Sequence, residues 1–207
     1  MKQSDIFRSA SWVGFSPDAA SVHARKSFFC ENTAKAELFI LGFGFFDAYI
    51  NGKPVTEDKF LPLNTDFHDR EILIDGKDWG EKTAHRVYAC KFDVTGLIAD
   101  GENVLGVMLG NGWYAGREHA YGDKKLIFRL CLTDKNGKTA EILSDDSVLW
   151  KKGFVTEYRF TNRQTQDFNG YDEAWLLPGG NINGFEKTNI TAIPETEFLF
   201  SDCPADR

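Results

Sequence analysis

Residues 103–116 read Asn-Val-Leu-Gly-Val-Met-Leu-Gly-Asn-Gly-Trp-Tyr-Ala-Gly, and the rest of the chain is organised around this stretch. Its first half, Val104 to Leu109, is a short apolar run between two glycine-containing turns, which is typical of a buried β-strand. Its second half places Trp113 and Tyr114 directly behind a loop that only small residues can form. Such an aromatic pair can offer a flat apolar face to a ligand, and it can equally close the end of a hydrophobic core. Both interpretations stay open on the sequence alone.

The composition favours β-structure over helix. Nineteen glycines separate short runs of Val, Ile, Phe and Tyr, and eighteen residues are phenylalanine. The 207 residues suit one domain of all-β size, or one domain with a short appendage, and a chain of this size hides roughly 70% of its unfolded surface. The net charge of −7 argues against nucleic acid as a partner, because phosphate binding requires clustered lysine and arginine.

Alternation of apolar and polar residues predicts a series of short strands. In the run 35–41, Ala36, Leu38 and Ile40 share one face. Two Asn-Gly pairs, at 51–52 and 136–137, predict hairpin turns, because both residues of such a turn accept a positive φ. Residues 95–98 are predicted to form a turn or a single helical turn. The expected strands are 26–30, 35–41, 45–50, 53–55, 85–94, 104–109, 126–133, 139–143, 149–150 and 155–160.

This pattern predicts an all-β fold, an antiparallel β-sandwich of jelly-roll, galactose-binding-like character. A βαβ fold would need amphipathic helices between the strands, and the sequence does not show them. We expect residues 1–24 to be a lead-in that packs on the sandwich, residues 25–175 to form the sandwich, and residues 176–207 to be irregular.

The four cysteines are far apart and include no Cys-x-x-Cys pair. Cys30, Cys90 and Cys131 lie within apolar runs, so we expect buried free thiols of a reducing compartment. The N-terminus lacks the apolar segment of a secretory signal, and the chain has no apolar stretch long enough for a membrane span. The sequence therefore predicts a cytoplasmic location and no membrane partner.

The most distinctive blocks of the sequence follow one another in a characteristic order. They are Arg25 to Phe28, Gly42 to Val55, Leu61 to His68, Phe92 to Ile98, Gly101 to Val104 and Leu109 to Gly116. In this order they resemble the N-terminal β-sandwich region of bacterial α-L-rhamnosidases, glycoside hydrolases that remove terminal L-rhamnose. The likeness covers roughly residues 10–175, and its last block is the most specific. Residues 168–174 are similar to a later family segment, whereas Leu63-Asn64 stands where the family usually has Gly-Trp.

The resemblance implies a non-catalytic module of a longer enzyme that hydrolyses terminal α-L-rhamnosyl residues. In that family a helical catalytic barrel follows this region, so the implied partners are that barrel and L-rhamnose-containing glycosides. The module would bind carbohydrate or shape the entrance of the active site. A purely structural domain that packs against the rest of the enzyme is the alternative.

The chain itself shows no convincing catalytic set. Glycoside hydrolysis needs two carboxylates flanking one bond, and the 31 acidic residues single out no such pair. Asp66, Asp93 and Asp172 lie within the family-like blocks, but Asp66 and Asp93 also suit local bonds that close a turn. The four histidines lack the spacing of metal ligands. We therefore expect no catalysis by these residues alone.

A sugar presents an apolar face for an aromatic ring and a rim of hydroxyls for polar side chains. The aromatic and polar residues of the family-like loops are therefore the predicted carbohydrate contacts: Trp113, Tyr114, Asn111, Arg117, Asp66, Asn64, Tyr171 and Asp172. Four of them, Asn64, Asp66, Asn111 and Asp172, also carry oxygens of the kind that bind calcium, although local loop bonds explain them equally. No other cofactor is expected.

Overall fold

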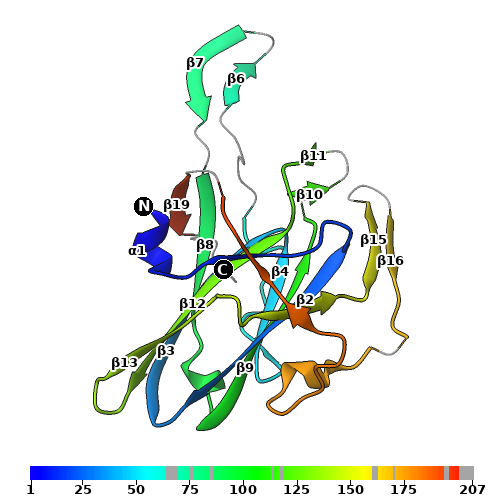
Figure 1. Cartoon of the computed structure of the whole chain (residues 1–207). Helices are drawn as coiled ribbons and strands as arrows, with labels where there is room; N and C mark the ends of the chain where they lie inside the picture. The colour runs from blue at the N-terminus through cyan, green and yellow to red at the C-terminus, as the bar shows by residue number, and fades with distance from the viewer. Residues whose placement is uncertain are drawn as a thin grey trace.

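The computed structural model describes residues 1–63, 70–74, 77–83, 86–112, 114–116, 119–159, 163–169, 171–193 and 196–200. Two β-sheets lie face to face and form a sandwich (Figure 1). Pairing within the sheets is antiparallel, except for the parallel pair at one edge of the first sheet. The predicted all-β antiparallel sandwich is confirmed.

The first sheet consists of β1 (Trp12–Gly14), β3 (Thr33–Phe43), β8 (Arg86–Asp93), β12 (Lys125–Asp134), β13 (Thr139–Leu143), β18 (Asn189–Thr191) and β19 (Glu197–Phe200). Its order is β18-β1-β12-β3-β8-β19, and β13 pairs with β12 as a hairpin around Gly137. β1 and β18, from opposite ends of the chain, extend this sheet beside β12, whereas β8 and β19 extend it beside β3.

The second sheet consists of β2 (Ser21–Cys30), β4 (Phe46–Ile50), β5 (Lys53–Pro54), β9 (Gly101–Gly110), β14 (Leu149–Lys152) and β17 (Glu186–Lys187). Its order is β17-β14-β2-β9-β4-β5. The Asn51-Gly52 turn joins β4 to β5 with φ values of 51° and 77°, which confirms the hairpin predicted from this dipeptide.

The remaining elements are three hairpins and three short helices. They are β6 (Arg70–Ile74) with β7 (Lys77–Thr83), β10 (Ala115–Gly116) with β11 (His119–Ala120), β15 (Val155–Arg159) with β16 (Arg163–Gln166), α1 (Gln3–Phe7), η1 (Thr95–Leu97) and η2 (Glu173–Leu176). The helical turn predicted at 95–98 is confirmed by η1. The β6–β7 hairpin stands away from the sandwich (Figure 1).

The main core fills the space between the two sheets and follows the strand alternation. Ala36, Leu38 and Ile40, the predicted inward face of β3, are fully buried there. Leu105 and Leu109 of β9 meet them from the second sheet. Because apolar burial provides most of the driving force for folding, this alternation is what selects the sandwich.

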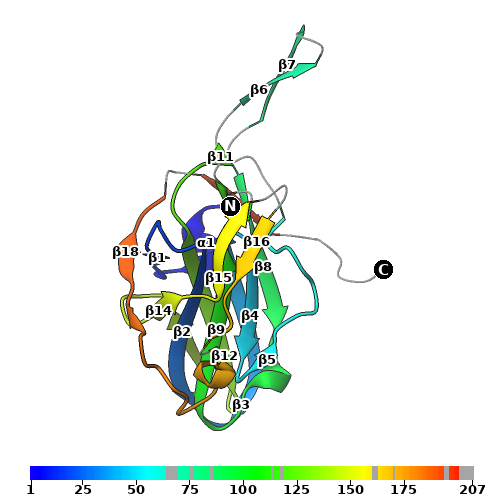
Figure 2. The same cartoon turned by 90° about the vertical axis from the view of Figure 1, so that its right-hand side faces the viewer.

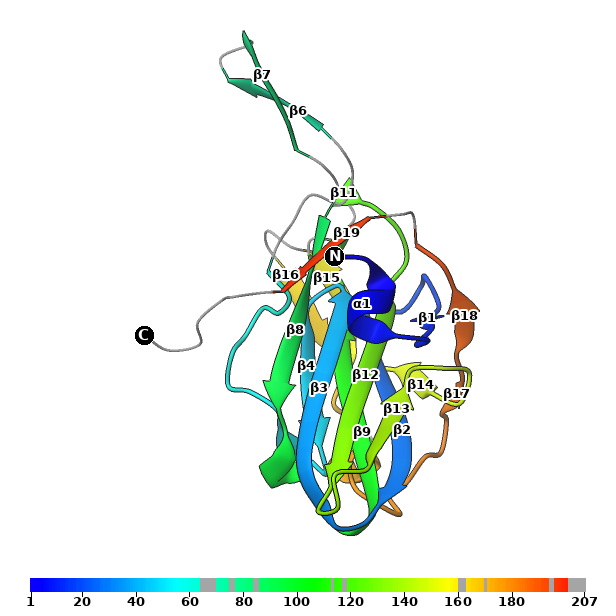
Figure 3. The ribbon, with the colours of Figure 1, turned by 90° about the vertical axis from the view of Figure 1, so that its left-hand side faces the viewer.

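A second apolar cluster covers the outer face of the first sheet. The helix α1 lies across β3 and β12 on this face (Figure 3), and its Phe7 is completely buried. Phe7 packs with Phe198 of β19 and with Leu41 and Phe43 of β3. Residues before the sandwich proper therefore complete a dry layer on this side.

The outer face of the second sheet is covered by η2 and by the β15–β16 hairpin (Figure 2). Trp175 and Leu176 of η2 pack onto Gly106 of β9, where an added Cβ would lie 2.2 Å from the Leu176 side chain. Arg25 of β2 holds η2 in place, because its guanidinium donates to the carbonyl oxygens of Trp175 (2.8 Å) and Leu177 (3.1 Å).

Some details differ from the sequence prediction. β2 begins at Ser21 rather than at Lys26, and α1, β1 and the short strands β16 to β19 were not predicted. Cys90 is buried as expected, but Cys30 and Cys131 are only half-buried, so the prediction of buried thiols was wrong for these two. Cys30 is the last residue of β2. Cys131 lies within β12, at a half-buried position that the apolar pattern of the sequence does not reveal. In the described part of the chain no helix has the length and apolar character that a membrane span requires.

Candidate functional site

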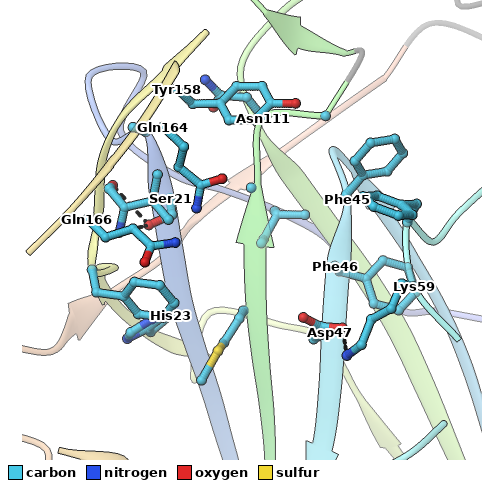
Figure 4. A pocket seen from close by; sticks show the side chains of 18 residues that line it. Ser21, His23, Phe45, Phe46, Asp47, Lys59, Asn111, Tyr158, Gln164 and Gln166 are labelled. Carbon is cyan, nitrogen blue, oxygen red and sulfur yellow. Dashed lines mark hydrogen bonds and ion pairs between the residues drawn. The ribbon is translucent and has the colours of Figure 1, made fainter. Parts of the chain in front are cut away.

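A groove of about 320 Å³ lies on the outer face of the second sheet, in the part that η2 leaves open. Residues of β2 and the β15–β16 hairpin line one side of it, and residues of β4 and the segment 59–60 line the other (Figure 4). Its lining includes Ser21, His23, Phe45, Asp47, Lys59, Phe60, Met108, Asn111, Tyr158, Gln164 and Gln166.

One row of cross-strand neighbours runs across the floor of the groove. His23 of β2 pairs with Met108 of β9, and Met108 pairs with Asp47 of β4. Their neighbours Val22 and Leu109 point into the main core. Since successive side chains of a strand alternate between faces, the three floor residues must point outward.

The hairpin wall is tied tightly to the start of β2. The Ser21 hydroxyl both donates to the carbonyl oxygen of Val155 and accepts from its amide, each at 3.1 Å. Gly153 makes this approach feasible, because a Cβ there would lie 2.4 Å from the Ser21 hydroxyl. The bonds position the hairpin so that Tyr158 and Gln164, which are cross-strand partners, line the groove.

The opposite wall combines an exposed aromatic ring with an ion pair. The Phe60 side chain is 74% exposed and contacts Phe45 edge to face, with 5.6 Å between ring centroids. Phe60 has a φ of 61°, a conformation that a bulky residue rarely adopts and that is more frequent at functional sites. Beside it, Lys59 Nζ lies 3.0 Å from Asp47 Oδ1, and this bond raises the pKa of Lys59.

His23 is a buried neutral group at the base of the groove. Its ring is 2% exposed and stacks on Trp175 with 4.8 Å between centroids. Burial lowers the pKa of His23 to about 4, so the imidazole is uncharged at neutral pH. Its Nδ1 has no hydrogen-bond partner among the residues that the structure describes.

Two residues predicted as carbohydrate contacts are placed near one another but differ in exposure. Asn111 lines the groove, and its Oδ1 accepts a hydrogen bond from Lys124 Nζ at 2.7 Å. Tyr114 is only 6% exposed and packs on Phe43 within the second apolar cluster. The structure thus places the Tyr114 ring in a core rather than at an open rim, and its contact with a ligand stays a prediction.

Tyr171 and Asp172 flank η2. The Tyr171 ring packs against His23 and Phe154, behind the groove, and burial raises the pKa of its hydroxyl to about 12. Asp172 is the N-cap of η2, because its Oδ1 accepts from the Ala174 amide at 2.8 Å. Asp93 likewise accepts from the Thr95 amide at 2.9 Å, which confirms the local role expected for it. The predicted contacts Asn64, Asp66, Trp113 and Arg117 lie outside the described residues.

Most of the groove was missed at the level of sequence. His23, Asp47 and Met108 lie at outward positions of three strands whose inward positions are recognisably apolar. The sequence therefore shows that each residue lies on the outward face of its strand. It does not show the strand register, which aligns the three residues across the sheet. Phe60 had no signal beyond being an aromatic residue in a polar segment.

No group of three or more His, Cys, Asp or Glu side chains in the described ranges is arranged to hold a metal ion. Of the oxygen ligands proposed for calcium, Asp172 bonds the backbone of η2 and Asn111 bonds Lys124. The calcium site stays a prediction that involves residues outside the described ranges.

The fold and the groove together define a class of protein: an antiparallel β-sandwich module with an apolar, polar-rimmed groove on one outer sheet face. Residues 31–75 and 79–207 match the family described as the alpha-L-rhamnosidase N-terminal domain. The chain belongs to this family, as its sequence blocks suggested.

Individual relatives agree with this assignment. An alpha-L-rhamnosidase of Formosa agariphila is 30% identical over 179 residues, which is 83% of this chain and 17% of the relative. The solved structure of the α-L-rhamnosidase from Dictyoglomus thermophilum is 25% identical, with a TM-score of 0.78 over 97% of this chain and 23% of its own. The Aspergillus terreus enzyme, 22% identical, shares the fold with a TM-score of 0.79 over the same shares. The chain thus spans less than a quarter of the length of these relatives.

Proposed function

We propose that the chain is the non-catalytic N-terminal module of an α-L-rhamnosidase and that it contacts carbohydrate through the groove on its second sheet. The parent enzyme would hydrolyse terminal α-L-rhamnosyl residues, with catalysis on a helical domain of the same polypeptide. Family membership supports the parent activity, because the relatives that match are α-L-rhamnosidases.

The observation that carries the carbohydrate role is the combination of Phe60 with the polar rim. An exposed ring in a sterically unfavourable backbone conformation stands beside an ion pair, and two glutamine amides line the opposite wall of the groove (Figure 4). L-Rhamnose is a 6-deoxy sugar, so it carries a methyl group and an apolar face as well as hydroxyls. An aromatic ring and nearby amide and carboxylate groups match both parts of such a ligand.

The test is a titration of the 207-residue chain with L-rhamnose, followed by amide NMR shifts. We expect saturable shifts at Asp47, Lys59 and Gln164 at tens of millimolar sugar. Phe60→Ala should weaken binding by about two- to twelvefold, because a ring contact contributes about 0.5–1.5 kcal/mol. The matched control is Phe29→Ala, which removes another exposed phenylalanine that does not line the groove.

An absence of saturable shifts, or equal binding by Phe60→Ala and the original chain, would contradict the groove assignment. Trp113→Ala in the same titration tests the separate prediction that Trp113 contacts the sugar.

The alternative is a structural module that packs against the rest of the enzyme without a ligand. Apolar side chains exposed along the C-terminal segment favour it, namely Leu177, Ile182 and Ile190. Triple replacement of these residues by serine would leave L-rhamnose binding intact under the groove proposal. In the full enzyme the same replacement would lower the thermal stability if the segment packs on another domain.

A further inference from the structure

A second cavity, of about 440 Å³, adjoins the groove and differs from it in chemistry. The two cavities share Ala20, Asn111 and Tyr158 as lining residues. The second one is bounded by residues 17–20 before β2, by residues 122–124 before β12, and by residues 156–158 of β15. Neighbouring units of one extended ligand could therefore occupy both cavities.

Lys124 places a buried positive charge at this second cavity. The residue is only 3% exposed and lines the cavity, and its Nζ donates to Asn111 Oδ1 at 2.7 Å. An ammonium group has three donors, and a buried charge is costly unless it is paired. Within the described part of the chain Lys124 forms no ion pair with any carboxylate.

The acidic side chains that line this cavity pair with other cations or face solvent. Asp18 is paired with Lys152 at 2.6 Å, and Glu157 is paired with Arg163 at 3.2 Å. Asp123 is exposed to solvent, and Tyr158 is a neutral phenol whose pKa is raised by burial. Burial lowers the pKa of Lys124 to about 8, with Asp123 and Asp18 acting in the opposite direction. The ammonium is therefore mostly charged at pH 6.5, and among the described residues no carboxylate lies within ion-pair distance of it, although Asp123 and Asp18 act on it from further away.

We propose that this cavity binds the carboxylate of a uronic acid, with Lys124 as the charged donor and Asn111 beside it. A carboxylate would form the direct ion pair that Lys124 does not make with any described residue, and hydrogen bonds between two charged groups are among the strongest in proteins. Because the two cavities share a wall, the full ligand is an acidic oligosaccharide with a neutral sugar against Phe60 and a uronic acid at Lys124. The sugar class rests on the proposed function, whereas the carboxylate preference rests on Lys124.

The test compares D-glucuronate with D-glucose, which differ only in carboxylate against hydroxymethyl, by amide NMR titration of the 207-residue chain at pH 6.5. We expect glucuronate to bind about tenfold more tightly, because a hydrogen bond between two charged groups is stronger than one from the ammonium to a neutral hydroxymethyl group. The shifts should centre on Asp123, Lys124 and Thr156. At pH 9.5 the preference should disappear, because Lys124 then loses its proton.

Lys124→Met removes the charge and keeps an unbranched side chain that is one atom shorter, and it should abolish the preference. The matched control is Lys125→Met, which changes the net charge equally but removes an ammonium that bonds the Ala192 carbonyl oxygen outside the cavity. Equal binding of both sugars by the original chain, or a preference that survives at pH 9.5, would overturn the proposal even if Lys124→Met does not fold. Sodium acetate that shifts the same amides with equal affinity would overturn the assignment to a sugar.

The outcome is separable from that of the proposed function. Loss of the L-rhamnose response concerns Phe60 and the groove, whereas loss of the glucuronate preference concerns Lys124 and the second cavity.

Discussion

On each outer face of the sandwich, a buried arginine holds a short helix against the sheet, but the two helices cover their faces to different extents. On the first sheet, buried Arg129 donates to the Ile6 carbonyl oxygen of α1 at 2.8 Å and pairs with Glu141 at 2.8 Å. On the second sheet, buried Arg25 donates to the Trp175 and Leu177 carbonyl oxygens. Each arginine thus fixes a short helix onto a sheet by satisfying carbonyl groups at its end, which a helix cannot bond internally.

α1 and η2 differ in how much of the outer sheet face they cover. Phe7 of α1 and Phe198 of β19 pack together on the outer face of the first sheet, and the resulting layer is apolar. η2 covers only part of the second sheet, and the polar floor residues His23 and Asp47 remain beside it. In this chain the groove therefore arises because an outer sheet face is incompletely covered, and not from a gap between the sheets.

The largest expected effect comes from opening the sealed face. Phe7→Ala removes a fully buried ring and should lower the free energy of unfolding by about 3–5 kcal/mol, because it combines lost burial with a cavity. Urea denaturation measures the loss. Phe29→Ala, at a ring that is 66% exposed, should cost less than about 1 kcal/mol, and similar losses for both variants would refute a sealed layer at α1.

A smaller effect should follow from releasing either helix. Arg25→Met leaves the carbonyl oxygens of Trp175 and Leu177 without their donor and should cost about 2–3 kcal/mol. Amide hydrogen exchange should then increase at Ala174 and Leu177. Arg129→Met is the matched variant, and its increase should appear at α1 instead. Exchange that rises equally at both helices in either variant would show that the two arginines do not act locally.

The smallest effect is a pH dependence confined to the groove side. The pKa of His23 is about 4 in the folded chain and 6.5 in the unfolded chain, so only the unfolded state binds this proton between those values. Stability is therefore complete above pH 6.5 and is lost as the pH falls toward 4, by about 1 kcal/mol at pH 5.5. His23→Phe keeps a ring against Trp175 and should lack this loss. Parallel denaturation profiles for the two chains between pH 7.5 and 5.5 would contradict the buried neutral state.

The strands of the core could be predicted because their signals are local. Ala36, Leu38 and Ile40 alternate with polar residues, and Asn51-Gly52 and Asn136-Gly137 carry their own turn geometry. α1 and the short strands near the C-terminus have no comparable signal, because two to five residues make too short a pattern. They form through long-range pairing, as when β18 joins β1.

The sandwich, the hairpins at Asn51-Gly52 and Asn136-Gly137 and the family could thus be predicted from the sequence, since alternation, turn chemistry and motif order are readable within short windows. Contacts between distant segments, in contrast, bury Tyr114, align His23, Met108 and Asp47 in one row, and enclose Lys124 beside Asn111. The physical reason is that register and burial depend on which distant segments meet. The sequence gives the chemical character of each residue, but its exposure and its contacts depend on how the sheets pack.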